Sequence, residues 1–254
     1  MKPLAVLVEA ALAGGSVLKG YFGSDFRISF KGAVNLVTEA DLASEREVVG
    51  ILRQRFPGAA ILAEEAGEAS GESGFRFIID PLDGTTNFAH GYPVFAVSIA
   101  CEEAATITAG VVYDPVRDEL FTAARSRGAF LNGRRLVVSV TRKLEEALLV
   151  TGFPYDLKDN LKGNLRLFER FMGVSRAVRR DGSAALDLCY VAAGRFDGFW
   201  EEKLGPWDTA AGALIVEEAG GCVSNLEGGP FHYRKGAIVA SNRALHDQMI
   251  ALTR

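Results

Sequence analysis

The chain has 254 residues, which is enough for one large domain or for two lobes that share a core. Hydrophobic residues make up 48% and charged residues 24%, values that are ordinary for a soluble globular protein. The formal net charge is −4 and the sequence has no basic tract, so it lacks the pattern expected of direct nucleic-acid binding.

Helical periodicity predicts helices over about residues 3–22, 40–56, 160–172, 183–194, 207–219 and 243–253. Strand-like apolar runs occur near residues 60–63, 75–79, 94–101, 106–113, 119–124, 147–151, 196–200 and 237–240. The four consecutive strands between 75 and 124 favour a layered α/β or α+β architecture, with a partly antiparallel sheet, over a doubly wound parallel sheet. The sequence DPVRDE between two of them is typical of a turn, and a lobe boundary is placed near residues 140–146.

The N-terminal run and the cysteines bear on the cellular location of the protein. Glu9 interrupts the first apolar run, and its alanines and leucines recur at helical spacing, so an amphipathic helix is favoured over a signal peptide. We expect no stretch to approach the ~18 apolar residues of a membrane span. Cys101, Cys189 and Cys222 lie far apart in apolar contexts, which favours buried thiols over a zinc site or disulfides. We therefore expect a cytoplasmic protein without a membrane partner.

The stretch from Asp80 to Phe88 reads DPLDGTTNF and places charge between two apolar runs. Asp80 is expected to end the strand FRFIID, because the proline after it keeps the backbone extended. Gly84 then allows a tight turn, and Thr85 or Thr86 can begin a helix. Such a strand–turn–helix would place two carboxylates beside the exposed N–H groups of a helix start.

That arrangement suits a metal and a phosphate together. The carboxylates of Asp80 and Asp83 favour a hard divalent cation, whereas the helix start favours an anion. A bound phosphate would satisfy both. The alternative is that Asp83 or Thr85 serves only as a turn residue or helix cap.

Further acids occupy similar places. Glu64 and Glu65 directly follow an apolar strand, and since adjacent strand residues point to opposite faces, only one of them is expected to reach the site. Asp208 lies where a helix begins, in GPWDTAAG, and could also be an N-cap. Asp41 lies early in the second predicted helix, where the helix dipole favours an acid in any case.

Together these acids supply hard oxygen ligands without a His–Cys cluster, which selects Mg²⁺ or Mn²⁺ over zinc. Several carboxylates cannot share one pocket without cations, because like charges at short range raise one another's pKa. A site with several metals that handles a phosphoryl group would account for all of them.

The segments NLVTEAD, EEAG, DPLDGTTNF, GSAALDL and PWDTAAG, in this order, resemble the inositol monophosphatase family of magnesium-dependent, lithium-sensitive phosphatases. The resemblance covers nearly the whole chain, as far as GAIVASN near the end. It implies one domain with an αβαβα layered sandwich of largely antiparallel mixed sheets, the inositol monophosphatase and fructose-1,6-bisphosphatase-like fold. A metal and phosphate lobe would span about residues 1–142 and a substrate lobe about residues 143–254, in a protein that forms homodimers.

The resemblance also implies two to three Mg²⁺ ions per site, with Mn²⁺ as an alternative. The implied ligands are Glu64, Asp80, the backbone carbonyl of Leu82, Asp83 and Asp208. Asp80 would bridge the first two metals, and a third, weaker metal would rest on Glu64 and waters, with Asp41 nearby. The metals would activate a water for attack on the phosphate of a phosphorylated polyol or sugar.

Substrate and water positions follow from the same resemblance. Thr85, helped by Asp41 or Glu64, would orient the water, and the N–H groups of Gly84 and Thr85 would hold the phosphate. The implied polyol contacts are Asp83, Ser183, Ala184 and Glu201, with Gly182 making the turn before them. His90 is expected to have a structural or rim role.

Some positions depart from the family pattern or leave the substrate open. Ala63 stands where the family usually has glycine, and the loop after Glu65 is short, which weakens the implied lithium sensitivity. Arg180 and Lys203 flank the predicted pocket and could be solvated charges or could favour a second phosphate. Because GFPYD and GSAALDL…WDTAAG most resemble the inositol-type branch, inositol-1-phosphate is the first expectation, and a fructose-1,6-bisphosphatase or a bifunctional enzyme is the second. Histidinol phosphate and adenosine 3′,5′-bisphosphate are substrates of other relatives, and a non-catalytic regulatory partner of the transcription machinery is the alternative from another class.

Overall fold

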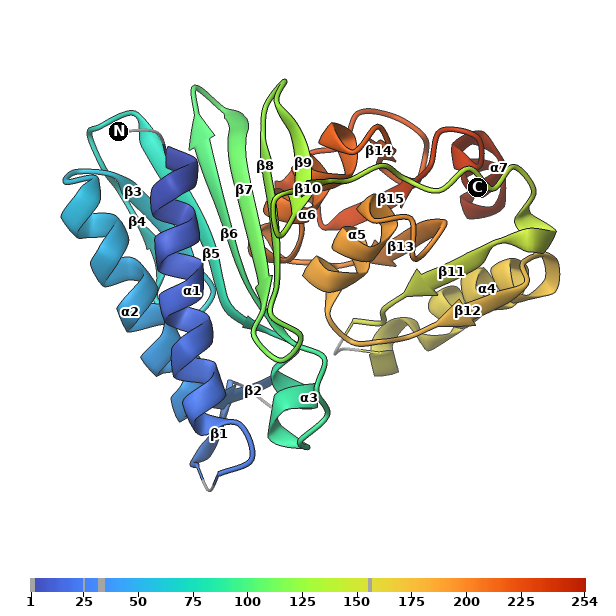
Figure 1. Cartoon of the computed structure of the whole chain (residues 1–254). Helices are drawn as coiled ribbons and strands as arrows, with labels where there is room; N and C mark the ends of the chain where they lie inside the picture. The colour runs from blue at the N-terminus through green and yellow to red at the C-terminus, as the bar shows by residue number, and fades with distance from the viewer. Residues whose placement is uncertain (1–2, 25, 32–34, 155–156) are drawn as a thin grey trace.

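The computed structural model describes residues 3–24, 26–31, 35–154 and 157–254. Helices and sheets alternate in five layers (Figure 1). Helices α1 (Pro3–Tyr21) and α2 (Glu39–Arg55) cover one face of an eight-stranded sheet. Helices α5 (Ala184–Ala192) and α6 (Pro206–Glu218) fill the space between that sheet and a second, five-stranded one. The expected αβαβα layered sandwich is therefore confirmed.

The large sheet is antiparallel except where β3 pairs with β5. In spatial order its strands are β10 (Arg134–Arg135), β9 (Gly128–Leu131), β8 (Glu119–Ala124), β7 (Thr106–Asp114), β6 (Ala96–Glu103), β5 (Phe75–Asp83), β3 (Ala60–Ala63) and β4 (Gly67–Ala69). The expected turn lies at residues 115–118, between β7 and β8. Because β3 and β5 are parallel, their carboxyl ends, and the acids that follow or end them, meet at one edge of the sheet.

The small sheet mixes parallel and antiparallel pairs. Its strands, in spatial order, are β12 (Ala177–Arg179), β11 (Leu148–Thr151), β13 (Gly198–Glu202), β15 (Ala237–Ser241) and β14 (Cys222–Ser224). Helices α4 (Leu157–Val174) and α7 (His246–Thr253) form the last layer. Strands β1 (Ile28–Lys31) and β2 (Asn35–Thr38) pair antiparallel in a separate two-stranded sheet, and two short 3-10 turns lie at Leu144–Glu146 and Tyr233–Lys235.

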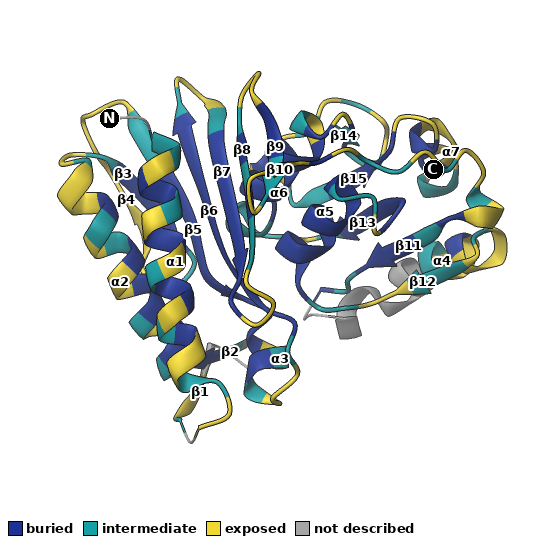
Figure 2. Ribbon diagram, viewed as in Figure 1, coloured by how far each residue is buried: buried dark blue, intermediate teal, exposed yellow. Residues whose placement is uncertain are grey.

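Helix α1 shows how the outer layer packs. Its buried residues recur at helical spacing, and its glycines allow a close approach to the sheet: a Cβ at Gly15 would lie 2.5 Å from the Tyr113 ring. Figure 2 shows the resulting alternation of buried and exposed positions along this helix. We expected no stretch to approach a membrane span. That expectation was wrong, because α1 is long and apolar enough to pass as one by length and mean hydropathy alone. Its buried residues pack against α2 and the large sheet.

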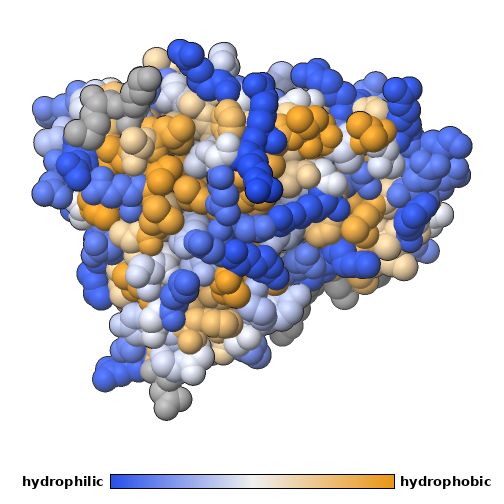
Figure 3. Space-filling model, viewed as in Figure 1, coloured by the Kyte–Doolittle hydropathy of each residue, from blue (hydrophilic) through white to orange (hydrophobic). Residues whose placement is uncertain are grey.

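The surface and the thiols agree with a globular fold. Figure 3 shows hydrophilic side chains interspersed with hydrophobic ones on one face, as is normal for a folded protein. All three cysteines are free; Cys101 and Cys189 are buried, whereas Cys222 is only partly buried, contrary to expectation. Residues 136–143 connect the two sheets without helix or strand, near the expected boundary, and the division into two lobes stays a prediction.

Candidate active site

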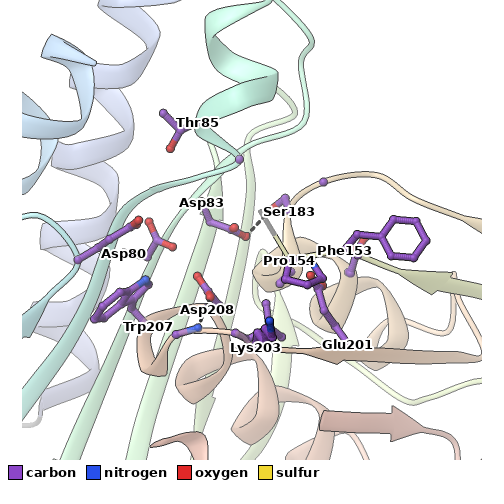
Figure 4. A pocket seen from close by; sticks show the side chains of 18 of the residues that line it. Asp80, Asp83, Thr85, Phe153, Pro154, Ser183, Glu201, Lys203, Trp207 and Asp208 are labelled. Carbon is purple, nitrogen blue, oxygen red and sulfur yellow. Dashed lines mark hydrogen bonds between the residues drawn. The ribbon is translucent and has the colours of Figure 1, made fainter. Parts of the chain in front are cut away.

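A pocket of about 340 Å³ opens where the carboxyl end of β5, the starts of α5 and α6, and the end of β13 converge. Figure 4 shows Asp80, Asp83 and Asp208 pointing toward one another, with Glu201 approaching from the small sheet. The pocket therefore has a carboxylate cluster at one end and a second buried acid at the other.

An irregularity in β5 aims two acids at the same space. On a regular strand, residues three apart point to opposite faces. The pairing of β5 with β6 shifts register between Asp80, opposite Ser98, and Asp83, opposite Ala96, so both carboxylates can face the pocket. The expectation that Asp80 ends the strand was wrong, because pairing resumes beyond the bulge. The Leu82 N–H donates to Asp80 Oδ1 at 3.0 Å.

Gly84 turns the chain from β5 into α3 (Thr85–Ala89), so the expected helix begins at Thr85. Gly84 has φ +97°, and a Cβ there would lie 2.8 Å from the Val94 carbonyl oxygen. Both facts require glycine at this position. The turn brings Thr85 and the backbone of Gly84 into the pocket wall.

Thr85 and Asp41 meet across 44 residues of sequence. Thr85 Oγ1 lies 3.1 Å from Asp41 Oδ1 and 3.0 Å from the Leu82 carbonyl oxygen. The other Asp41 oxygen accepts hydrogen bonds from the Thr38 N–H, at 2.8 Å, and from the Thr38 hydroxyl. Burial raises the pKa of Asp41 against these hydrogen bonds. Asp41 thus lies behind Thr85, outside the residues that line the pocket, and fixes its hydroxyl.

Asp208 enters the cluster from the first turn of α6. The N-cap of that helix is Gly205, and Asp208 is the third residue of its first turn. The alternative that Asp208 is the N-cap was therefore wrong. Asp208 Oδ2 accepts a hydrogen bond from the Gly205 N–H at 2.6 Å. One carboxylate oxygen from each of Asp80, Asp83 and Asp208 lies within 4.8 Å of the others. These atoms converge closely enough to share a cation.

The electrostatics of the cluster fit a hard divalent cation. Burial first, then the charges of Glu64, Asp83 and Asp208, raise the pKa of Asp80 well above its ordinary value. Burial raises the pKa of Asp83 to about 6 despite its hydrogen bonds, and burial with the charge of Asp83 raises the pKa of Asp208 to about 7. Since all the donors are oxygens, Mg²⁺ or Mn²⁺ matches them in softness as well as in charge.

These pKa values predict how metal removal changes stability with pH. Because the pKa values of Asp83 and Asp208 are about 6 and about 7 in the folded state, against 3.8 ordinarily, unfolding releases their protons. Without metal, the protein should lose stability as pH rises from about 4 to about 7. Melting temperatures measured in EDTA and in Mg²⁺ should therefore diverge as pH rises. Equal melting temperatures at every pH would contradict a cation at these carboxylates.

Asp83 also links the cluster to the end of the pocket lined by Ser183, Ala184 and Glu201. We call this the alcohol end, because the predicted polyol contacts lie there. Asp83 Oδ2 accepts hydrogen bonds from the Ser183 hydroxyl at 2.6 Å and from the Ala185 N–H at 2.7 Å. Ser183 is the N-cap of α5. Gly182, with φ +84°, makes the turn beneath it, and its carbonyl and that of Asp181 accept hydrogen bonds from the Asn87 side chain.

Glu201 is buried at the end of β13, and burial first, then the charges of Asp208 and Asp83, raise its pKa well above the ordinary value. Gly152 makes room for this side chain, because a Cβ there would lie 2.2 Å from Glu201 Oε2. An acid held in this way can accept hydrogen bonds from alcohol hydroxyls.

The structure brings most of the predicted positions to one pocket. The predicted residues that line it are Glu64, Asp80, Leu82, Asp83, Gly84, Thr85, Gly182, Ser183, Ala184, Glu201 and Asp208. Glu64 lies beside β5, with its N–H donating to the Ile79 carbonyl, whereas the N–H of Glu65 donates to Glu45 outside the pocket. Arg180 and Lys203 line the pocket too. His90 contacts the Thr86 carbonyl on an exposed turn outside it.

Sequence reasoning missed several lining residues: Gly152, Phe153, Pro154, Asp187, Leu204, Gly205 and Trp207. The sequence GFP directly follows β11, so an apolar strand ending in glycine is a signal for the first three. Asp187 is the only charged residue of an otherwise apolar helix, and that is a signal too.

Carboxylates that converge beside the turn at Gly84 suit a metal-assisted reaction of a phosphate ester. Residues 2–254 match the model of the inositol monophosphatase family. The chain belongs to this family, and it is a phosphatase that acts on phosphate monoesters. The family is metal-dependent and acts on small phosphorylated substrates.

Individual relatives agree over almost their whole length. A protein of Pseudomonas aeruginosa named Nus factor SuhB is 53% identical, with 95% of this chain and 92% of that protein covered. Inositol-1-monophosphatase of Synechocystis is 47% identical, with 97% and 86% covered. The crystal structure of extragenic suppressor protein suhB from Bartonella henselae is 45% identical and superimposes with a TM-score of 0.95, covering 98% of this chain and 97% of that one.

Proposed function

We propose that the protein hydrolyses inositol-1-phosphate to inositol and phosphate with Mg²⁺ as cofactor. The observation that carries this proposal is the double role of Asp83. Its carboxylate belongs to the acidic cluster and also bonds Ser183 and the start of α5 beside Glu201. One pocket therefore offers a cation site for the phosphate and, next to it, hydroxyl acceptors for a polyol.

The ligand set that we propose consists of Glu64, Asp80, the Leu82 carbonyl, Asp83 and Asp208, for two to three Mg²⁺ or Mn²⁺ ions. Divalent cations at these oxygens supply Lewis acidity, which offsets charge on the phosphate and lowers the pKa of water. Burial first, and then the charges of the neighbouring acids, raise the pKa of Asp80, and this supports the assignment because cations would offset the repulsion between the acids.

The chain itself orients the phosphate and the attacking water. We assign the N–H groups of Gly84 and Thr85 to the phosphate, since the turn presents both to the pocket. When the Thr85 hydroxyl donates its hydrogen to Asp41, its oxygen is left to accept a hydrogen bond from water. Thr85 and Asp41 together would hold the attacking water, and the proton that the water loses would pass through the Thr85 hydroxyl toward Asp41.

A second phosphate on the substrate is the closest alternative. Arg180 and Lys203 both line the pocket near Glu201, where they could contact an anionic group. This placement supports fructose 1,6-bisphosphate hydrolysis, alone or beside inositol-1-phosphate hydrolysis. The cytoplasmic location, the homodimer and the lithium sensitivity stay predictions.

The proposed function is tested by phosphate release from a panel of substrates. The panel contains inositol-1-phosphate, fructose 1,6-bisphosphate, histidinol phosphate and adenosine 3′,5′-bisphosphate, each with Mg²⁺ and with EDTA. We expect the highest kcat/KM for inositol-1-phosphate, lost in EDTA. A preference for fructose 1,6-bisphosphate would replace the substrate, and full activity in EDTA would overturn the metal assignment.

A glycine substitution tests the polyol end without touching the carboxylate cluster. Gly152→Ala would place a Cβ 2.2 Å from Glu201 Oε2, so the carboxylate must move. We expect KM for inositol-1-phosphate to rise about tenfold, which corresponds to one lost hydrogen bond to a charged group. Gly50→Ala is the matched control, because nothing lies within 4 Å of a Cβ there. An unchanged KM in Gly152→Ala would remove Glu201 from the substrate contacts.

The relative named Nus factor SuhB supports a second candidate function, as a partner of the transcription machinery. Such a role needs the folded surface but not the chemistry. A tagged Asp80→Asn protein should then recover polymerase-associated proteins from a cell extract as well as the wild type does. Recovery of none by either protein would exclude this second function.

A further inference from the structure

Helix α5 carries one charged side chain in a wholly buried position. Every residue of the helix is buried (Figure 2), and Asp187 is 1% exposed. Among the residues that the structure describes, Asp187 Oδ1 has no hydrogen-bond partner, although the residue lines the pocket. A buried carboxyl oxygen without a partner is costly, and one that belongs to a pocket-lining residue calls for an explanation.

The helix places Asp187 on the substrate side. The Asp187 N–H donates to the Ser183 carbonyl at 2.9 Å, so the two residues lie one turn apart on the same face of α5. Ser183 faces the pocket and bonds Asp83. Asp187 thus lies one turn deeper than the contact that ties Asp83 to the helix, toward the alcohol end of the pocket.

The charged neighbours of Asp187 do not compensate it. Its pKa is raised well above the ordinary value, by burial first and then by the charges of Asp181, Glu201 and Asp83. Arg180 acts in the opposite direction but does not reverse the shift. Arg180 therefore leaves the carboxyl undercompensated, and Asp187 Oδ1 keeps an acceptor position that a neutral donor can fill. A ligand hydroxyl is such a donor.

We propose that Asp187 is a specificity-determining residue that contacts a hydroxyl of the substrate alcohol, beside the hydroxyl contacted by Glu201. The two acids would then select phosphate esters whose alcohol presents two neighbouring hydroxyls over esters of simple alcohols or phenols. This inference rests on the proposed function and deepens it, because it names the feature of the alcohol that the pocket recognises.

The test compares substrates with and without hydroxyls in the Asp187→Asn variant. We expect kcat/KM for inositol-1-phosphate to fall about tenfold or more, and kcat/KM for 4-nitrophenyl phosphate to change less than about twofold. Asp187→Leu, which has the same branching at Cγ but a larger side chain and no hydrogen-bonding group, should lose more of the preference. Asp181→Asn is the matched control: it removes a charge from the same neighbourhood but lies outside the lining residues, and it should keep the wild-type preference.

A second measurement asks whether the loss belongs to one hydroxyl of the substrate, first in the wild type and then in Asp187→Asn. Singly deoxygenated inositol phosphates are assayed in turn, and one analogue should lose about tenfold in kcat/KM through the absent Asp187 contact. That analogue should show no further loss in Asp187→Asn, as a double-mutant cycle requires for one shared contact.

The outcomes separate the two claims. If the wild type shows no preference for inositol-1-phosphate over 4-nitrophenyl phosphate, the proposed polyol substrate fails. If the wild type has the preference but Asp187→Asn and Asp187→Leu retain it, Asp187 serves only the packing of α5 and the inference is overturned. Additive losses for every deoxy analogue in the variant would overturn it as well.

Discussion

Asp80→Asn should lower kcat/KM for the phosphate ester by about 1,000-fold or more, because several kcal/mol of transition-state stabilisation depend on the cation held there. Asp80 is 1% exposed and lies among the charges of Glu64, Asp83 and Asp208. Asparagine keeps the oxygen that accepts from the Leu82 N–H but removes the charge. Steady-state kinetics with saturating Mg²⁺ measure the loss.

The same substitution should not unfold the protein. Removing one of several like charges relieves repulsion in the metal-free state, so the melting temperature in EDTA at neutral pH should stay equal or rise. Mg²⁺ should stabilise the variant less than the wild type. Glu145→Gln is the control: Glu145 forms an exposed ion pair with Lys143 and is not among the residues that line the pocket, so the change should affect neither activity nor melting temperature. Wild-type activity in Asp80→Asn would exclude Asp80 as a metal ligand.

Thr85→Val should lower kcat by about 100-fold with little change in KM. Valine has nearly the same shape, but it cannot donate to Asp41 Oδ1 and cannot accept a hydrogen bond from water. General acid–base groups contribute about 100-fold or more, and the loss should appear in the chemical step rather than in binding. Single-turnover kinetics separate the two.

The control for Thr85 keeps the hydroxyl. Thr85→Ser should retain kcat within about tenfold of the wild type, because the hydrogen bond to Asp41 can still form. Asp41→Asn should act in the same direction as Thr85→Val, and the double variant should lose little more than either single one. Equal kcat in Thr85→Val and the wild type would show that another group orients the water.

How far the sequence predicts this molecule depends on how local each feature is. Strands such as β6 and β7 are long enough for their apolar runs to be recognised. Strands β4, β12 and β14 have three residues each, and β10 has two, so they have no periodicity and form because a neighbour pairs with them. The helix start at Thr85 is local too, since Gly84 dictates the turn.

Some features of the site are local in sequence and others depend on distant parts of the chain. That acids follow apolar strands is visible in the sequence, and so is the resemblance that assigns them roles. The register shift that lets Asp80 and Asp83 face one pocket is not visible, because it depends on pairing with β6. Asp187 is visible as the single acid of an apolar helix, but an acid in the first turns of a helix also looks like a partner of the helix dipole. Its unpartnered oxygen becomes evident only once α5 is buried.

The hydrogen bonds from Ser183 and Ala185 to Asp83 join the large sheet to the central helix layer. On one side of this junction lie the acids of β5 and the turn at Gly84; on the other lie Glu201 on β13 and the loop after β11. In the proposed function, the hydrolytic groups thus come from the large sheet and the start of α6, whereas the groups that contact the alcohol come from the small sheet and α5. Mutations in the small sheet can therefore move the protein from one alcohol to another during evolution while the hydrolytic half stays intact.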